Sequence, residues 1–369
     1  MKGAAAAAAD QKIGAAAAAA AAAAEHDDTD DADEVWPSSN EELWRDVTPL
    51  STVLDEGPHP VVEIDTSPQF RRAHALLYAL LSAGERSQRA LDLTREVIHL
   101  NNANYTAWHY RRQILEGMEG EWDLADELAF SEEWIFDSPK SYQVWQHRRW
   151  LVEKAADPSK ELEVCASVLN NDAKNYNAWS HRQWVVRTYG LWAAELAFAE
   201  AMLQEDFRNN SAWNHRHYVV SHELRSCSGQ EDQISAIRSR EISYASSWLA
   251  LAPHNESAWN YLASWFAEGG ERHTAERRPW SEIPNELEDR IASVVASHPR
   301  CRFALEVLAK VASARGDGEA ACQRWRELAD SDPVRRRYWE YMADRERERE
   351  RERTIALQQT GAGAGSGEG

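Results

Sequence analysis

SYQVWQHRR at residues 141–149 is one of several related segments, each built around a tryptophan. The others read NYTAWHYRR at 104–112, NYNAWSHRQ at 175–183, NNSAWNHRH at 209–217 and, more weakly, NESAWNY at 255–261. Successive tryptophans are 37, 34, 34 and 46 residues apart. A period near 34 residues is typical of a helix-turn-helix solenoid, because two antiparallel helices of about a dozen residues use that much chain with their turns. The repeats therefore predict an all-α fold.

Each repeat divides into two amphipathic helices. In residues 90–100 apolar side chains return every three or four positions, which predicts a first helix. The tryptophan segment predicts the second helix, and apolar residues seven positions later share its buried face: Leu115, Val152, Val186 and Val220. Polar punctuation at 101–102, 138–139, 170–171 and 209–210 is expected to provide the N-caps of the second helices. Because one pair cannot bury its stripe alone, the pairs are expected to stack into a right-handed α–α superhelix over about residues 66–342, with Phe303 and Trp339 continuing the pattern.

Composition narrows the class of partner. The 369 residues hold 41 basic and 61 acidic side chains, a formal charge of −20, which argues against binding nucleic acid or an anionic membrane surface. With 43% hydrophobic and 28% charged residues, the chain has enough apolar side chain for a large core inside a solvated exterior. Its 17 tryptophans against 7 phenylalanines indicate a repeated packing role for the indole ring.

The two ends differ from the repeats, and three regions are expected. Residues 1–40 carry a ten-residue alanine run, too short and too weakly apolar to span a membrane, followed by an acidic cluster, so they are expected to be a disordered tail. The solenoid is expected over 41–343. Residues 344–369 alternate Arg and Glu before a Gly-rich end and are expected to be a solvated overhang, with a charged docking tail as the alternative. The four cysteines lack metal-site spacing, which favours reduced thiols in a cytoplasmic protein.

The repeated side chains have a structural interpretation. An arginine three residues after each tryptophan is expected to lie beside the core indole and bind carbonyls of the adjoining turn. His147, His181 and His215 are 34 residues apart, so they fall on successive repeats, too far from one another to share a metal ion. No nucleophile elbow, phosphate loop or metalloprotease motif is present, so the chain by itself carries no recognisable catalytic centre.

A polar cluster precedes the second helix of one repeat. Ser138 could cap this helix and Pro139 suits its first position, which would place Lys140 and Tyr142 at the positive end of the helix dipole as partners for a diphosphate. The Gln143 amide could donate to a carboxylate. The structural alternative is a solvated lysine beside a packing tyrosine.

At these residues the chain resembles a known family. The Tyr-x-x-Trp-x-His-Arg segments at 142–148 and 176–182, with Asn-Ser-Ala-Trp-Asn at 210–214, resemble the α subunits of the protein prenyltransferases over about residues 42–342. Residues 44–50, 57–62 and 84–87 look like the α subunit shared by farnesyltransferase and geranylgeranyltransferase type I. The Rab geranylgeranyltransferase α subunit is the nearest competitor within the family.

This resemblance implies a heterodimer that transfers a farnesyl or geranylgeranyl group from its diphosphate to the cysteine of a C-terminal CaaX motif. The β subunit would form an α/α barrel holding the catalytic Zn²⁺ and most of the isoprenoid pocket, and Mg²⁺ would be the second cofactor. By the same resemblance, Lys140, Tyr142 and Tyr176 would contact the diphosphate, while Gln143 would bind the carboxylate of the CaaX peptide and Tyr105 would lie near the end of that peptide.

Two positions depart from the family pattern. Ser141 stands where Asn is common and Asn177 where His is common; both keep a polar side chain, so small changes in hydrogen bonding are expected. The remaining alternative is a non-enzymatic helical-repeat scaffold that binds other proteins, although such a scaffold gives no reason for Lys, Tyr and Gln to gather at one turn.

Overall fold

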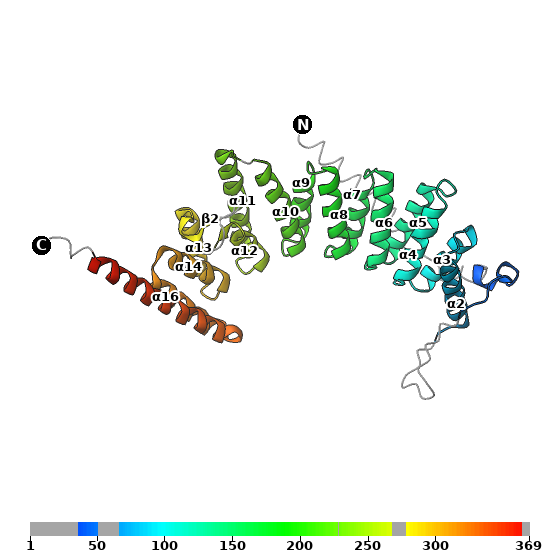
Figure 1. Ribbon diagram of the computed structural model, residues 1–369. Coiled ribbons are helices and arrows are strands. Elements are labelled where there is room, and N and C mark those ends of the chain that lie inside the picture. The colour runs from blue at the N-terminus through cyan, green and yellow to red at the C-terminus, as the bar shows by residue number, and fades with distance from the viewer. Residues whose placement is uncertain (1–35, 51–65, 228, 268–277, 364–369) are drawn as a thin grey trace, which may run out of the picture. The chain divides into compact units, whose positions relative to one another are not determined.

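The computed structural model describes residues 36–50, 66–227, 229–267 and 278–363, and the chain divides after Gly190 into two compact units. Figure 1 shows the helices of the first unit standing side by side in chain order. Each unit is built from antiparallel helical hairpins, so the predicted all-α, hairpin-stacking superhelix is confirmed. The predicted right hand of the superhelix stays a prediction.

The first unit opens with two 3₁₀ turns and continues with seven helices in its described part. The turns are η1 (Pro37–Ser39) and η2 (Glu42–Trp44). The helices are α2 (Pro68–Ala83), α3 (Gln88–Leu100), α4 (Tyr105–Gly117), α5 (Leu124–Asp137), α6 (Tyr142–Ala155), α7 (Glu161–Asn171) and α8 (Tyr176–Tyr189). The second helices α4, α6 and α8 pack on one another as one layer, and α5 packs on α7 in the other.

The second unit has eight helices within its described residues. They are α9 (Glu195–Glu205), α10 (Asn210–Ser226), α11 (Glu231–Leu251), α12 (Glu256–Ala263), α13 (Asn285–Ser297), α14 (Arg302–Arg315), α15 (Gly318–Ser331) and α16 (Arg336–Gly363). Two short strands, β1 (Phe266–Ala267) and β2 (Arg278–Pro279), pair in parallel, and the 3₁₀ turns are η3 (Trp280–Glu282) and η4 (Pro333–Arg335). These strands are a small exception to the predicted all-helical span.

The turn inside each hairpin corrects the predicted N-caps. The predicted punctuation at 101 and 138 ends the first helix, and that at 170–171 lies in the last turn of α7, just before its end at Asp172. The second helix is capped three residues after Asn101, Ser138 and Asp172, by Asn104, Ser141 and Asn175. In each turn the cap amide donates to the carbonyl of the residue that ends the first helix, as from Asn175 to Asp172 at 2.9 Å. Only the punctuation at 209–210 was placed correctly, since Asn209 does cap α10. The prediction erred because this three-residue turn lies between the two signals.

The tryptophan column is the repeated core element, as predicted. Each indole Nε1 donates to the carbonyl six residues earlier, inside the turn: Trp108 to Asn102, Trp145 to Pro139, Trp179 to Ala173, Trp213 to Phe207 and Trp259 to Pro253, at 2.7–3.0 Å. The apolar residues seven positions after the first four tryptophans are buried. In the helix capped by Cys301, the position four residues after the cap, which a tryptophan occupies in the earlier repeats, holds the buried Leu305. The prediction that Phe303 would continue the tryptophan column was therefore wrong.

A buried ladder of charges joins successive hairpins. Glu127 on α5 accepts from Arg111 of the preceding hairpin and pairs with His147 of its own hairpin, both at 2.6 Å. The same arrangement recurs as Arg148, Glu161 and His181 and, in the second unit, as Arg216, Glu241 and Tyr261. The arginines also donate to backbone carbonyls, but these lie inside the first helices and not in the adjoining turn as predicted: Arg111 to Leu91, Arg148 to Leu128 and Arg182 to Leu162. Each carboxylate is therefore shared by two hairpins.

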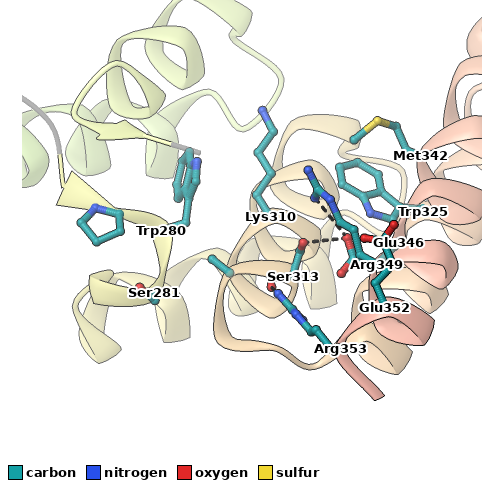
Figure 2. Close-up of a pocket in the computed structure, with 12 residues that line it drawn as sticks. Trp280, Ser281, Lys310, Ser313, Trp325, Met342, Glu346, Arg349, Glu352 and Arg353 are labelled. Carbon is teal, nitrogen blue, oxygen red and sulfur yellow. Dashed lines mark hydrogen bonds and ion pairs between the residues drawn. The ribbon is translucent and has the colours of Figure 1, made fainter. Parts of the chain in front are cut away.

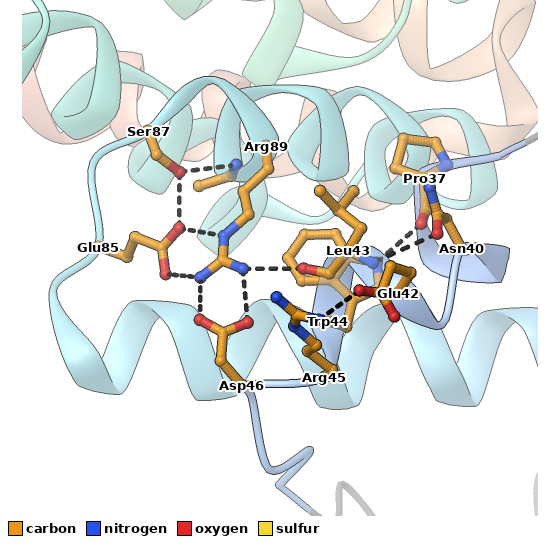
Figure 3. Close-up of polar contacts among 11 residues, drawn as sticks. Pro37, Asn40, Glu42, Leu43, Trp44, Arg45, Asp46, Glu85, Ser87 and Arg89 are labelled. Carbon is orange, nitrogen blue, oxygen red and sulfur yellow. Dashed lines mark hydrogen bonds and ion pairs between the residues drawn. The ribbon is translucent and has the colours of Figure 1, made fainter.

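The described end of the predicted N-terminal tail packs on the first hairpin. Ser38 is buried, and both its amide and its hydroxyl donate to the buried carboxylate of Glu96. Beyond it, Arg89 donates to Asp46, Glu85 and the Leu43 carbonyl (Figure 3). The boundary expected at residue 40 is thus too late for residues 36–40, while residues 1–35 lie outside the described residues.

The C-terminal boundary is also displaced. α16 continues without a break past residue 343, and its Trp339 and Ala343 join the core formed by α14 and α15. Glu346, within the segment expected to be a solvated overhang, is buried and accepts from Ser313 at 2.7 Å. Residues 364–369 of this predicted region lie outside the described residues.

Candidate functional site

Three exposed tyrosines begin successive second helices of the first unit. Tyr105, Tyr142 and Tyr176 are the first residues of α4, α6 and α8, and they remain 75%, 60% and 68% exposed. The rings of Tyr142 and Tyr176 lie 6.2 Å apart between centroids. Because the hairpin turns are alike, the structure brings these predicted site residues to one edge of the unit, where the helix dipoles present their positive ends.

Lys140 lies in the turn just before this edge. The predicted cap is corrected here, because Ser141 rather than Ser138 precedes α6, and Ser141 makes no side-chain capping bond. Lys140 therefore lies two residues before the first residue of α6 rather than in its first turn. Its side chain is 83% exposed, with Nζ 3.6 Å from Oδ2 of Asp172.

Gln143 joins the turn of the preceding hairpin to this edge. Its Nε2 donates to the carbonyl of Ala103 at 2.9 Å, and its Oε1 accepts from the Ser141 hydroxyl at 3.2 Å. Ala103 lies two residues before Tyr105, so Gln143 and Tyr105 border the same turn. A primary amide carries two N–H donors, so Gln143 keeps one for a carboxylate.

The two departures from the family pattern support the turn that carries Lys140. The carbonyl of Pro139 accepts from Trp145 Nε1 at 2.8 Å, from Asn175 Nδ2 at 3.2 Å and from Asn177 Nδ2 at 3.4 Å. Asn177 is buried, so it acts on the Pro139 turn rather than reaching outward. Ser141 instead directs its hydroxyl to Gln143 and to the Asn102 carbonyl.

A groove runs from this edge between α6 and α8. It encloses about 200 Å³ and is lined by Tyr142, Tyr176 and Asn177 at one end and by Arg149 and Trp184 at the other. The Arg149 guanidinium lies 4.7 Å from the centre of the Trp184 ring. The groove is small, so it can receive only part of a ligand.

The difference between the caps of α6 and α8 gives a stability prediction. Asn175 is buried, accepts from the Ala178 amide at 2.9 Å and donates to Pro139, so Asn175→Ala is expected to cost about 2 kcal/mol. Ser141→Ala removes no capping bond and is expected to cost clearly less, under about 1 kcal/mol. Urea unfolding of the full chain measures both, and equal losses would contradict this account of the caps.

A larger cavity in the second unit does not have the chemistry of an anion site. It encloses about 390 Å³ between η3, α14, α15 and α16 (Figure 2). Its three cations are already paired with carboxylates, Lys310 with Glu306, Arg349 with Glu346 and Arg353 with Glu350. Within the described residues, no group of three His, Cys, Asp or Glu could hold a metal ion, so these residues do not fit a zinc site.

Sequence reasoning missed the glutamates of the buried ladder. Glu127, Glu161, Glu195 and Glu241 are 34, 34 and 46 residues apart, the same steps as the tryptophans from Trp145 to Trp259. Each lies 18 residues before its tryptophan, on the first helix of the hairpin. This periodicity was the available signal, because a carboxylate that recurs in register with a buried arginine is expected to pair with it.

The comparisons with known proteins agree with this architecture. The family model "Protein prenyltransferase alpha subunit repeat" matches residues 87–118, 124–155, 158–189, 192–223 and 238–267. In the part of the chain that the structure describes, no helix is both long and apolar enough to cross a membrane.

Individual relatives carry related names. A Candida albicans protein farnesyltransferase/geranylgeranyltransferase type-1 subunit alpha is 30% identical over 82% of this chain and 96% of its own. An Arabidopsis thaliana protein of that name is 45% identical, but the match spans 27% of this chain and 29% of the relative. A Rattus norvegicus geranylgeranyl transferase type-2 subunit alpha is 32% identical over 28% of this chain and 20% of its own.

A solved structure extends the likeness to three dimensions. Candida albicans protein geranylgeranyltransferase-I complexed with GGPP matches with a TM-score of 0.70 and 28% identity, over 82% of this chain and 98% of that one. The repeats, the near full-length relative and this structure agree, and the chain belongs to the protein farnesyltransferase/geranylgeranyltransferase type-1 alpha subunit family.

Proposed function

We propose that this chain is the α subunit of a heterodimeric CaaX prenyltransferase, in which it supplies the edge that holds the isoprenoid diphosphate and the end of the peptide. The observation that carries the proposal is the convergence of Lys140, Tyr142 and Tyr176 at the N-terminal ends of α6 and α8. The comparisons support membership of the family. That this chain assembles with a β subunit, binds an isoprenoid diphosphate and serves a CaaX substrate is part of the proposal.

The diphosphate end has a clear physical basis. The N-terminus of α6 points backbone N–H groups and the positive end of its dipole at this edge, and Ser141 does not occupy them. Lys140 adds a mobile positive charge, and the two tyrosine hydroxyls add donors. As the thiolate of the substrate attacks C1 of the isoprenoid, negative charge grows on the departing pyrophosphate. Lys140 would stabilise that charge more strongly in the transition state than in the bound substrate.

The part of the edge proposed to bind the end of the peptide includes residues of the preceding hairpin. Gln143 is fixed through its bond to Ala103 and keeps one N–H for a carboxylate, while the exposed ring of Tyr105 borders the same turn. Zinc, which we assign to the β subunit, would supply activation of the substrate cysteine as a thiolate, and Mg²⁺ would accompany the diphosphate. The described residues of this chain contribute binding and orientation.

The cytoplasm is the proposed compartment. Cys165, Cys227, Cys301 and Cys322 are all free thiols in the structure, which is typical of a reducing environment.

Co-expression with a farnesyltransferase or geranylgeranyltransferase type I β subunit tests the proposal. Lys140→Ala is expected to slow single-turnover transfer about tenfold to a hundredfold while changing isoprenoid diphosphate affinity much less. Gln143→Ala is expected to raise the KM for the CaaX peptide instead. Lys160→Ala is the matched control, since Lys160 is an exposed lysine in the loop between α6 and α7, at the other end of these helices. An unchanged single-turnover rate in Lys140→Ala would overturn the assigned role, and absence of complex and transfer would leave a Rab-type subunit or a scaffold.

A further inference from the structure

Lys140 is held by a carboxylate that the proposed reaction has not yet used. Its Nζ lies 3.6 Å from Oδ2 of Asp172, and the two side chains are 83% and 38% exposed. Asp172 comes from the next hairpin along the chain, in the turn that leads to Tyr176. The pair therefore spans the same two turns that would meet the diphosphate.

Asp172 is fixed more firmly than its partner. Its amide closes the last turn of α7 by donating to the Val168 carbonyl, and its own carbonyl accepts from Asn175, both at 2.9 Å. Its Oδ1 accepts from the Lys174 amide at 3.2 Å, which leaves Oδ2 facing Lys140. Lys140 reaches this carboxylate on a flexible four-carbon stem. The Asp172 carboxylate is thus a fixed partner for the mobile ammonium group of Lys140.

We propose that Asp172 is a positioning residue that holds Lys140 beside Tyr142 and Tyr176 and gives it up when a diphosphate binds. This inference rests on the proposed function. Lys140 exchanges the carboxylate oxygen for a phosphoryl oxygen, which carries more negative charge and forms a stronger charge-assisted bond. Because exposed ion pairs are weak, the exchange is easily made, and the carboxylate lowers the affinity for diphosphate without preventing its binding.

The pairing has a measurable consequence for affinity. Asp172 opposes an incoming diphosphate both by direct repulsion and by competing for Lys140. Asp172→Asn keeps an oxygen that can accept from Lys174 and removes the charge. It is expected to tighten the binding of inorganic pyrophosphate to the heterodimer about two- to fivefold, the range that corresponds to an exposed ion pair.

A double-mutant cycle separates competition from repulsion. In the Lys140→Ala background only repulsion remains, so Asp172→Asn is expected to tighten pyrophosphate binding less than it does in the wild type. Asp206→Asn is the matched control, because Asp206 ends α9 and its Oδ1 accepts from the Arg208 amide at 2.8 Å in the equivalent turn before α10, which carries none of the residues proposed to contact the diphosphate. Its substitution is expected to leave pyrophosphate affinity nearly unchanged.

The outcomes are distinct. Tighter binding that depends on Lys140 supports the positioning role of Asp172. An equal gain with and without Lys140, or no gain, overturns it while leaving the proposed function intact. If the heterodimer binds pyrophosphate but Lys140→Ala does not weaken that binding or slow transfer, the proposed function itself fails.

Discussion

Replacing Glu161 with alanine is expected to lower the free energy of unfolding by about 3–5 kcal/mol. The carboxylate lies between Arg148 and His181, which bind it at 2.7 Å and 2.8 Å, and all three side chains are buried. Burial opposes ionisation of this carboxyl, yet the hydrogen bonds from His181 and Arg148 keep its pKa below the usual value. Removing it leaves the buried Arg148 guanidinium with only the partly exposed Glu132 carboxylate as a counter-ion and leaves buried donors unpaired, which is far more costly than losing an exposed pair.

Glu132 provides the matched control. Its carboxylate contacts the same Arg148 guanidinium at 3.3 Å, but its side chain is 36% exposed, so Glu132→Ala is expected to cost no more than about 1 kcal/mol. Urea unfolding of the full chain followed by tryptophan fluorescence compares the two variants. Similar losses would show that the buried ladder does not hold the hairpins together.

Acidification is expected to destabilise the chain through His147. Complete burial lowers the pKa of this imidazole from its usual 6.5 to about 4, despite the neighbouring Glu127 carboxylate. Between these values the unfolded chain binds a proton that the folded chain does not. The stability contributed by neutral His147 is therefore complete above pH 6.5 and is lost as the pH falls to about 4, by about 3 kcal/mol.

Protonation of Glu127 is expected to cause a further loss of folding stability at lower pH. Burial would raise the pKa of its carboxyl, but Arg111 and His147 outweigh it and bring the pKa down from 4.5 to about 2. Its contribution is present above pH 4.5 and disappears as the pH falls towards 2. His147→Gln tests the first window: its unfolding free energy is expected to change less between pH 6.5 and 4 than that of the wild type. Parallel profiles would assign the acid sensitivity to other groups.

The period of the tryptophans predicted the fold because it records a spatial repeat. A buried indole that bonds to its own turn imposes the same local geometry each time it recurs, as at Trp145 and Trp179. The caps were harder to place, since Asn and Ser also end helices and a polar residue at 101 or 138 serves either purpose. Periodicity thus determined which helices form but not where each turn closes.

The candidate site was predictable only in part. Helix-terminus chemistry predicted a polar edge at Lys140 and Tyr142, although it placed Lys140 inside the helix rather than before it. The support that Asn177 and Asn175 give to the Pro139 carbonyl comes from a different hairpin. Such a contact depends on how hairpins stack. The packing of Ser38 on Glu96 was missed for the same reason, because the partners are 58 residues apart and no periodic signal connects them.

The turn that joins the two helices has the same number of residues in five of the hairpins. From the end of the first helix to the cap of the second, the spacing is the same in the hairpins capped by Asn104, Ser141, Asn175, Asn209 and Asn255. The change in tryptophan spacing from 34 to 46 residues is absorbed elsewhere, as in the 21-residue helix α11. Insertions are therefore tolerated where one hairpin leads to the next, and a label or tag placed in the loop at 156–160 would leave the Lys140 edge in register.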